Sequence, residues 1–389
     1  MELTLFVDHQ CNLRCTYCYN GEKFTRPMSI DTAKKAVDIA LSATLAASRR
    51  HIDISFFGGE PMLRMGLIRE IVEYCEHEVQ ESGRKITQRY IMNTNGTLMN
   101  DDSIEFMSKP RTFVTFISLD GDRETHDQFR VNAAGKGSYD DVMDGVRQLR
   151  NAGIPYQLVG VVNVATAAAL GRTVRNLAAE SIDKKLVLAT NYRDDWTDAS
   201  IEVLRRGLND AGDVWMDMFR NGRKLIVEPL HSKILTHLKG GIPCPGRCQL
   251  AGSEMCVAPS GNIYPCAQMV GEDNDDTLVI GHVDTGLDLD KLRLMQLQKD
   301  MSEAKCAPCD LRTRCQSHCG CTHVAVSGKL GDITGVLCEL ESAYIDAADR
   351  VAEQLYLEGC PAFMQFYYEK RWVPALGGVL TELRRSRDG

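Results

Sequence analysis

Several features are missing from this chain of 389 residues, and each absence excludes a class of protein. No apolar run approaches the ~20 residues that a membrane-spanning helix needs. No charged N-terminal region precedes an apolar core and a cleavage site, so we expect no secretory signal peptide. There is no long basic block and the net charge is −8, which argues against tight binding to nucleic acid. The sequence also has no internal repeat and no low-complexity tract.

Cysteine, in contrast, is abundant. The chain holds 15 cysteines, and all but Cys75 and Cys360 fall into two groups, at 11–18 and 244–338. In a chain without a secretion signal, such clusters argue for metal rather than for disulfides. We therefore expect a metalloprotein of the reducing cytoplasm. Cys75 lies on the apolar face of an expected helix and is predicted to be a core residue, and Cys360 a structural or free thiol.

The first group of cysteines predicts an unusual iron–sulfur site. Cys11, Cys15 and Cys18 are spaced Cys-x3-Cys-x2-Cys and directly follow an apolar run from Leu3 to Val7. A loop this short can place three thiolates on three corners of one [4Fe–4S] cube. Iron–sulfur clusters usually take four cysteines. A cluster held by three keeps an open coordination position, as a catalytic zinc ion does.

This spacing, with the aromatic Tyr17 before the third cysteine, resembles the radical S-adenosylmethionine (SAM) enzymes. In that family the open iron binds the amino and carboxylate groups of SAM. One electron then cleaves the sulfonium, and the resulting 5′-deoxyadenosyl radical abstracts a hydrogen atom. The rival interpretations are a zinc site or three unrelated thiols.

The first half of the chain alternates between strand-like and helix-like segments. The expected strands are Glu2–Val7, Ile52–Phe57, Arg89–Asn93, Phe113–Leu119, Tyr156–Val162 and Leu186–Ala189. Helices are expected between them, one beginning at a Ser29 N-cap. Six such repeats predict an α/β fold with a parallel sheet and right-handed crossovers. Periodicity leaves a doubly wound sheet open, and the resemblance implies a six-stranded partial TIM-like (β/α) barrel.

The same pattern predicts how the chain divides. The expected parts are a radical SAM core at 1–221, a connection at 222–243, a cysteine-rich domain at 244–340, and a C-terminal helix and tail at 341–389. Chemistry in such barrels collects at the C-terminal ends of strands. The motifs of the first half all fall there.

Two of these strand ends are predicted to bind SAM. Gly58, Gly59 and Glu60 follow the second strand, where glycine lets backbone approach a ligand closely. The resemblance implies that this stretch holds the SAM amino group through backbone atoms. Ser118 and Arg130 belong to a Ser-x-Asp-Gly and His-Asp-x-x-Arg pairing, which the resemblance implies for the ribose and carboxylate of SAM.

Other polar residues near these strand ends have ordinary alternatives. Asn95 lies in an Asn-Gly turn after the third strand, and Asn163 ends the fifth strand. Both are candidate contacts to SAM or substrate. Tyr17 is expected near the adenine, or else as an anchor for its loop. Asp120 and His126 either assist SAM binding or shape the loop between Ser118 and Arg130.

The second group of cysteines resembles the SPASM domain, which follows radical SAM cores that act on peptides and proteins. The resemblance rests on seven positions: Cys256, Cys266, Cys306, Cys309, Cys315, Cys319 and Cys338. It implies two auxiliary [4Fe–4S] clusters, which makes three clusters in the chain. The first would use Cys256, Cys266, Cys319 and one upstream thiol, with Cys248 preferred and Cys244 as the alternative. The second would use Cys306, Cys309, Cys315 and Cys338. Cys321 is surplus, and the rival reading is zinc.

The resemblance narrows the function without naming the substrate. Enzymes with SPASM domains include anaerobic sulfatase maturases and maturases of ribosomally made peptides. Sulfatase maturases carry an aspartate base directly after the second of the seven cysteines, and here that residue is Ala267. We therefore expect an oxidoreductase that cross-links or oxidises a small ribosomal peptide. Sulfatase maturation is the alternative, and an electron-transfer protein or a zinc-held scaffold are further ones.

The expected partners follow from that chemistry. They are a precursor peptide or protein substrate and a ferredoxin or flavodoxin that donates electrons. Only ten residues precede Cys11, so we expect no N-terminal leader-binding module and allow for a separate leader-binding protein. The alternative is that the substrate docks on the aromatic and basic tail that begins at Cys360. No nucleic acid and no membrane are expected.

Overall fold

The computed structural model describes residues 1–108, 110–181, 185–241, 248, 250–252, 254–301, 303–316 and 319–368. The alternative ligand Cys244 and the tail after Tyr368 lie outside these residues. No helix in the described part of the chain is both long and apolar enough to cross a bilayer. The chain forms two compact units. The first contains residues 1–159, 180–183 and 248–300, and the second contains residues 160–179, 184–247 and 301–389.

Parallel strands form the centre of the first unit. In sheet order its strands run β11-β10-β9-β8-β1-β2-β3-β4-β5. The parallel ones are β1 (Glu2–Phe6), β2 (His51–Phe57), β3 (Thr87–Thr94), β4 (Phe113–Ser118), β5 (Tyr156–Val162, of which the first four residues belong here) and β8 (Glu254–Val257). Three short antiparallel strands extend the edge: β9 (Asn262–Tyr264), β10 (Gly281–His282) and β11 (Gly286–Leu287).

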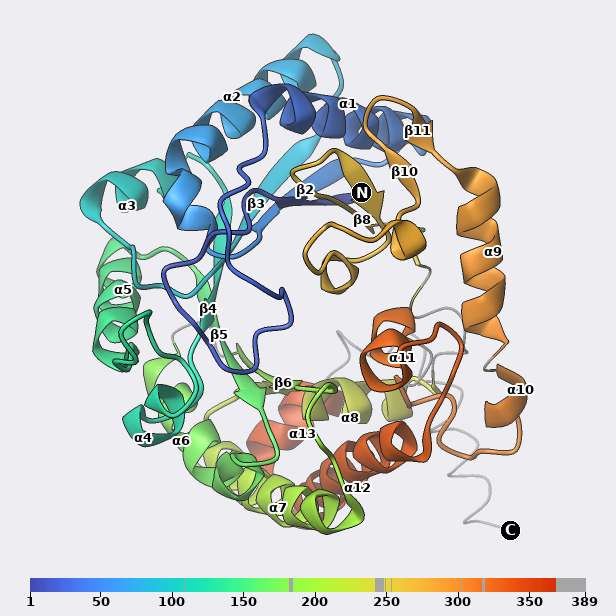
Figure 1. Cartoon of the computed structure of the whole chain (residues 1–389). Coiled ribbons are helices and arrows are strands. Elements are labelled where there is room, and N and C mark those ends of the chain that lie inside the picture. Colours follow the sequence, from blue (N-terminus) through green and yellow to red (C-terminus); the bar gives the residue numbers. More distant parts are fainter. Residues whose placement is uncertain are drawn as a thin grey trace. The chain divides into compact units, whose positions relative to one another are not determined.

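Amphipathic helices pack on these strands. Ser29 caps α1 by accepting from Thr32 N–H, as predicted, and the α2 stripe of Ile68, Ile71, Val72, Cys75 and Val79 is buried. In Figure 1 both helices lie along the outer side of β1 to β3. The helices of this unit are α1 (Ile30–Ala46), α2 (Met65–Glu81), α3 (Asp101–Met107), α4 (Arg123–Asp127), α5 (Tyr139–Ala152) and α9 (Leu289–Asp300), with short 3₁₀ turns at Pro61–Arg64, Ala267–Met269 and Asp276–Leu278.

The second unit is mainly helical. It holds the parallel pair β6 (Lys185–Thr190) and β7 (Ile226–Glu228). Its helices are α6 (Leu170–Glu180), α7 (Asp198–Arg220), α8 (Leu230–Leu238), α10 (Glu303–Cys306), α11 (Gly320–Ser327), α12 (Gly335–Leu357) and α13 (Pro361–Tyr368), with a 3₁₀ turn at Ala167–Ala169. Trp215 of α7 and Tyr344 of α12 are buried in its core.

All six predicted strands are present within two residues of their expected ends. The predicted connection at 222–243 contains β7 and α8, which the sequence analysis did not identify. The three residues of β7 are too few to show a period. The two units interleave along the chain, so the domain limits expected from the sequence stay a prediction.

Candidate active site

The loop with the first three cysteines leaves β1 and is closed at its base by one carboxylate. Asp8 is fully buried, and its Oδ1 accepts from Gln10 N–H (3.1 Å) and from Arg26 N–H (2.9 Å). Its Oδ2 accepts from Arg64 Nε at 2.6 Å. Residues 10 and 26 flank the cysteines, so Asp8 fixes both ends of the loop.

The three thiols lie within electrostatic reach of one another and of basic groups. Burial raises the pKa of the Cys11 thiol to about 11, with Glu60, Cys15 and Cys18 contributing. Burial also raises the pKa of Cys15, and Arg130 opposes that shift. The ammonium of Lys23 donates to Cys18 Sγ at 3.1 Å. Thiolates are the metal-binding form, so loading a metal would release these protons.

The glycines after β2 press against the base of this loop. Gly58 has φ +137°, and a Cβ there would lie 2.4 Å from the Asp8 carbonyl oxygen. A Cβ on Gly59 would lie 2.2 Å from the Gln10 carbonyl oxygen. The Gly59 N–H donates to the Asp8 carbonyl at 2.8 Å, and the Glu60 N–H to the Gln10 carbonyl at 2.9 Å. Only glycine permits this approach.

The buried carboxylate of Glu60 forms hydrogen bonds to the ends of neighbouring strands. Its Oε1 accepts from Met62 N–H (3.0 Å) and from the Thr94 hydroxyl (2.7 Å), and its Oε2 accepts from Asn95 N–H (2.8 Å). These bonds join the ends of β2 and β3. Burial raises the pKa of Glu60, and the three bonds oppose the shift. The carboxylate is engaged within the protein, so a cofactor contact from this stretch would come from backbone atoms.

Asn95 connects the end of β3 to the cysteine loop. Its Nδ2 donates to Asn12 Oδ1 at 2.8 Å, and its Oδ1 accepts from Thr97 N–H and from the Thr97 hydroxyl. Asn12 in turn donates to the Thr97 hydroxyl at 2.8 Å. The Asn-Gly sequence therefore does more than turn the chain, because it holds the residue after Cys11 in place.

The Tyr17 hydroxyl lies between Asp120 and Arg130 and forms a hydrogen bond with each. The Tyr17 hydroxyl donates to Asp120 Oδ2 at 2.5 Å and accepts from Arg130 Nη1 at 2.7 Å. Burial raises the pKa of Tyr17 well above its ordinary value, so it remains a neutral phenol. The phenol thus orients the guanidinium beside the cysteines, which gives Tyr17 an anchoring role whether or not it also meets an adenine.

His126 shapes the loop that carries Asp120 and Arg130. The Ser138 hydroxyl donates to the Arg130 carbonyl (2.8 Å), so the ring Nε2, 3.0 Å from that hydroxyl, is the donor to it. The ring Nδ1 then accepts from Asp120 N–H at 3.3 Å. Burial and the charge of Arg130 lower the pKa of His126 to about 3, so the ring is neutral. The loop-shaping alternative for His126 has direct support in these bonds.

The two remaining candidates are Ser118 and Asn163. Ser118 is half-buried in the last position of β4, next to the Asp120 loop. Asn163 belongs to the second unit, is buried, and accepts from Asn191 Nδ2 at 3.0 Å. Its own Nδ2 has no hydrogen-bond partner among the described residues.

The residues present fit a bound SAM in one specific respect. Arg130 is 6% exposed, and its buried Nε has no hydrogen-bond acceptor in the described part of the chain. A buried cation with an unused donor is costly unless an anion is bound. A carboxylate offers two acceptors to a guanidinium, so the SAM carboxylate suits this position.

The cysteines expected to hold auxiliary clusters fall in both units. Cys256 in β8 is buried, and burial followed by Cys266 raises its pKa well above the ordinary value. Cys248 belongs to the same unit and is half-buried. Cys319 belongs to the second unit, where its Sγ lies 3.2 Å from the Sγ of Cys321. That contact places the surplus Cys321 beside an expected ligand.

The second expected auxiliary set lies wholly in the second unit. Burial raises the pKa of Cys338, followed by the charges of Cys306 and Cys309. The Cys309 N–H donates to the Cys306 carbonyl at 3.0 Å, and Cys315 N–H to Leu311 O at 2.9 Å. Cys338 lies in the first turn of α12, so the helix start brings it to the Cys306–Cys309 turn.

Sequence reasoning missed Asp8, Lys23 and the buried Asp273, which accepts from Arg26. Asp8 had a usable signal, because an aspartate at the end of an apolar strand is buried only with a structural or functional partner. The partner of Asp273 lies 247 residues away in sequence, so no local pattern identifies it.

Comparisons with known proteins agree with this arrangement. A family model described as the radical SAM superfamily matches residues 7–206. The chain is 27% identical over 333 residues to a cysteine-type anaerobic sulfatase-maturating enzyme of Clostridium novyi, covering 79% of this chain and 84% of the relative.

Two solved structures share the fold. The structure titled "Native anSMEcpe with bound AdoMet" superposes with a TM-score of 0.75 at 18% identity, covering 91% of this chain and 99% of the other. Streptococcus suis SuiB bound to its precursor peptide SuiA gives a TM-score of 0.55 at 15% identity, covering 86% and 75%. The predicted α/β class with a partial TIM-like barrel is thereby confirmed.

Proposed function

This chain belongs to the radical SAM superfamily, and we propose that it modifies a side chain or Cα position of a peptide or protein substrate. It is an enzyme that uses a [4Fe–4S] cluster and SAM, as the family and the fold shared with an AdoMet-bound relative show. The observation that carries the SAM chemistry of this proposal is the buried Arg130 with its unused Nε beside Cys15, in the loop of three cysteines.

When bound, the cluster and SAM supply reductive cleavage of the sulfonium and a radical that abstracts hydrogen, which is chemistry no side chain offers. Cys11, Cys15 and Cys18 would hold the cluster. The backbone of Gly58 and Gly59 would face the SAM amino group, and Arg130 would bind its carboxylate. Tyr17 keeps the guanidinium oriented through its own bond to Asp120.

Other predicted contacts are retained in the same proposal. Ser118 would meet the ribose, and Asn95 and Asn163 remain candidate contacts. The SPASM cysteines would bind two auxiliary clusters that pass electrons, in the sets expected from the sequence, with Cys248 as the upstream ligand. A ferredoxin or flavodoxin would supply the electron, and a separate protein would present a leader peptide. We expect the protein to work in a reducing cytoplasm, where iron–sulfur clusters and their electron donors are found.

A peptide substrate is supported by the named relatives. SuiB was solved with a precursor peptide, and the chain shares its fold over most of its length. Residue 267, which directly follows Cys266, is a half-buried alanine with no ionisable group. Because the base expected of a sulfatase maturase is missing there, we place cross-linking or oxidation of a ribosomal peptide first.

Formylglycine formation on a sulfatase is the second candidate. It is favoured by the match to the Clostridium novyi enzyme, which spans most of both chains. A different base would then have to replace the missing aspartate, because proton removal needs a group within hydrogen-bond reach of the substrate.

The test is anaerobic purification followed by metal analysis and calorimetry with SAM. About twelve iron atoms per chain, four for each of three clusters, support the proposal. Stoichiometric zinc without iron, or no SAM binding by iron-loaded protein, rejects it. Sulfatase-derived peptides with a target cysteine or serine then separate the candidates, because only the second candidate converts them to an aldehyde.

A further inference from the structure

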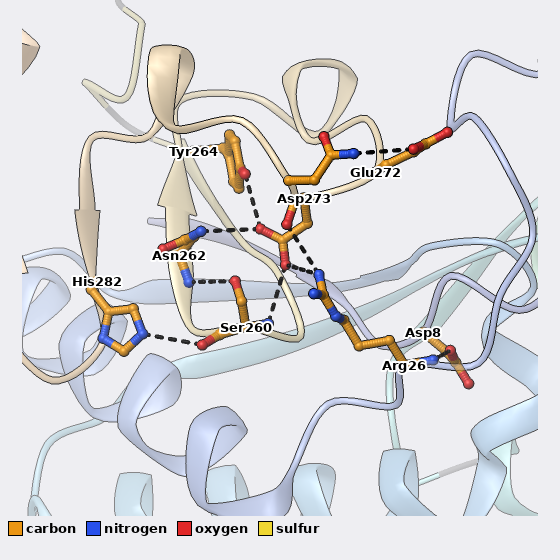
Figure 2. A network of polar contacts seen from close by, with 9 residues as sticks. Asp8, Arg26, Ser260, Asn262, Tyr264, Glu272, Asp273 and His282 are labelled. Carbon is orange, nitrogen blue, oxygen red and sulfur yellow. Dashed lines mark hydrogen bonds and ion pairs between the residues drawn. The ribbon is translucent and has the colours of Figure 1, made fainter.

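A buried carboxylate connects the hairpin of Cys256 and Cys266 to the segment that follows Cys18. Asp273 is 5% exposed and lies in the loop after β9. It accepts from four donors: Arg26 Nη1 (3.3 Å), Ser260 N–H (3.2 Å), Asn262 Nδ2 (3.2 Å) and the Tyr264 hydroxyl (2.9 Å). Figure 2 shows these four donors, three side chains and the Ser260 backbone, around the one carboxylate. All of them belong to the first unit.

The two oxygens of Asp273 have different partners. Oδ1 takes the bonds from Asn262 and Tyr264, both in β9. Oδ2 takes the bonds from Ser260 N–H and from Arg26. Arg26 also donates to the Asp273 backbone carbonyl at 3.0 Å. One oxygen therefore organises the hairpin, and the other attaches it to the N-terminal segment.

The neighbouring Glu272 makes a second attachment to the same segment. Its Oε1 accepts from Glu22 N–H at 2.9 Å. Gly21 has φ +69°, and a Cβ there would lie 2.4 Å from that Oε1. Any side chain at position 21 would displace Glu272, so the close approach requires glycine.

The attachment continues to the base of the cysteine loop. Arg26 binds Asp273 through its guanidinium and Asp8 through its backbone N–H. Strands β1 and β8 are parallel neighbours, with Thr4 paired to Cys256. Their C-terminal ends therefore lie at one edge of the sheet, where β1 leads to Cys11 and β8 leads to Ser260.

We propose that Glu272 and Asp273 form an acidic clasp that fixes the Cys256–Cys266 hairpin against the loop of Cys11, Cys15 and Cys18. Both are positioning residues, because their carboxylates accept hydrogen bonds from protein donors. Their functional importance rests on the proposed function, in which both segments carry redox centres. Electron transfer between such centres depends on their separation. Small displacements of the residues that position them therefore lower the catalytic rate strongly.

The decisive variant is Asp273→Asn. An amide keeps one acceptor oxygen for Tyr264 and Asn262, yet it presents an NH₂ group to Arg26 and Ser260 N–H. We expect amide hydrogen exchange to accelerate about tenfold in both 19–28 and 256–266, because a bond to a charged group is lost. Unchanged exchange in 19–28 would overturn the clasp.

Two matched variants separate the clasp from general damage. Arg26→Met removes the same attachment from the other side, at a side chain that is 44% exposed and tolerant of change. It should reproduce the faster exchange, and combining it with Asp273→Asn should add little. Tyr264→Phe removes only a bond to Oδ1, so exchange should accelerate in 256–266 alone. Additive effects of Arg26→Met and Asp273→Asn would contradict a shared contact.

A spectroscopic measurement links the clasp to function. In reduced, SAM-bound Asp273→Asn, microwave power saturation of the N-terminal cluster signal should shift from wild type, because relaxation by a neighbouring cluster depends on distance. Tyr264→Phe should leave it within error. Hydrogen exchange needs no cluster, so a failure of the proposed function would remove this signal without altering the exchange result. An unchanged saturation profile with iron-loaded protein would reject the positioning role.

Discussion

The two Cys-x2-Cys turns of this chain share one backbone hydrogen bond and differ in the side chains around them. Cys18 N–H donates to Cys15 O at 3.1 Å, and Cys309 N–H donates to Cys306 O at 3.0 Å. Around the first turn stand the cations Lys23 and Arg130. Around the second, the charges that act most on Cys338 are thiols and the carboxylates of Glu339 and Glu341, all of which raise its pKa after burial.

This difference indicates which interactions stabilise each site. The first loop is fixed by Asp8, Asn12 and Asn95, so its shape depends on the protein. The charges of Arg130 and Lys23 oppose the rise in the pKa of Cys15 that burial causes. At Cys338 the charges of Cys306, Cys309, Glu339 and Glu341 add to the effect of burial, so a bound metal would supply energy that holds these thiolates together.

A buried ion pair stands beside the second group. Lys233 Nζ lies 2.6 Å from Glu341 Oε2, with both side chains under 5% exposed. Glu341 also accepts from Gln316 N–H, next to Cys315. The pair therefore joins α8 and α12, and Glu341 connects it to Gln316.

The largest effect should come from Cys15→Ala. Removal of one of three ligands should reduce 5′-deoxyadenosine formation to background, because the open-iron cluster is lost. Iron should fall from about twelve to about eight atoms per chain if the auxiliary clusters persist. Persistent SAM cleavage under strong reductant would show that the first loop is not the SAM site. Cys75→Ala, at a buried core thiol, serves as the control and should retain SAM cleavage.

Breaking the ion pair should destabilise the second unit next most strongly. Lys233→Met leaves Glu341 buried and unpaired, which typically costs about 3–5 kcal/mol. Anaerobic denaturant unfolding measures the loss. The double variant Lys233→Met with Glu341→Gln should recover part of it, because the buried charge is gone. Equal losses in the single and double variants would mean that packing, not charge, supports this region.

Substitution at Arg130 should weaken SAM binding by an intermediate amount. Arg130→Met removes a charged donor from the expected carboxylate site, which costs about 1.5–3 kcal/mol, or roughly ten- to a hundredfold in Kd. Calorimetry on iron-loaded protein measures this. Arg130→Lys should restore little, because an ammonium cannot replace the fork that also bonds Tyr17. Wild-type affinity in both variants would exclude Arg130 from the SAM site.

The effect that is smallest near neutral pH, and that grows as the pH falls, should appear in the pH dependence of stability. The folded pKa of His126 is lowered to about 3, so the unfolded chain binds the proton first as pH falls below about 6.5. Stability is then lost on acidification between these values, by at most about 1.4 kcal/mol per pH unit. His126→Asn should flatten the profile between pH 6 and pH 4. An unaltered slope would assign the acid sensitivity to other groups.

The sequence predicted the regular part of this molecule well. Six apolar runs became strands, Ser29 capped its helix, and Cys75 was buried, because each depends on local periodicity or capping. The strands β8 to β11 were missed because two to four residues show no period. The stretch with Glu60 was predicted to meet the cofactor through backbone atoms, which stays a prediction. The bonds of its carboxylate to Thr94 and Asn95 could not be predicted, because only the folded sheet creates them.

The pairing of β8 with β1 has a consequence for synthesis. The first strand gains one neighbour when β2 is made, yet its other edge is covered only by residues 254–257. Until that part of the chain leaves the ribosome, β1 presents an unpaired edge just before the cysteines. Such edges recruit other strands. During synthesis β1 therefore keeps one edge open to foreign strands until about 250 further residues have been made.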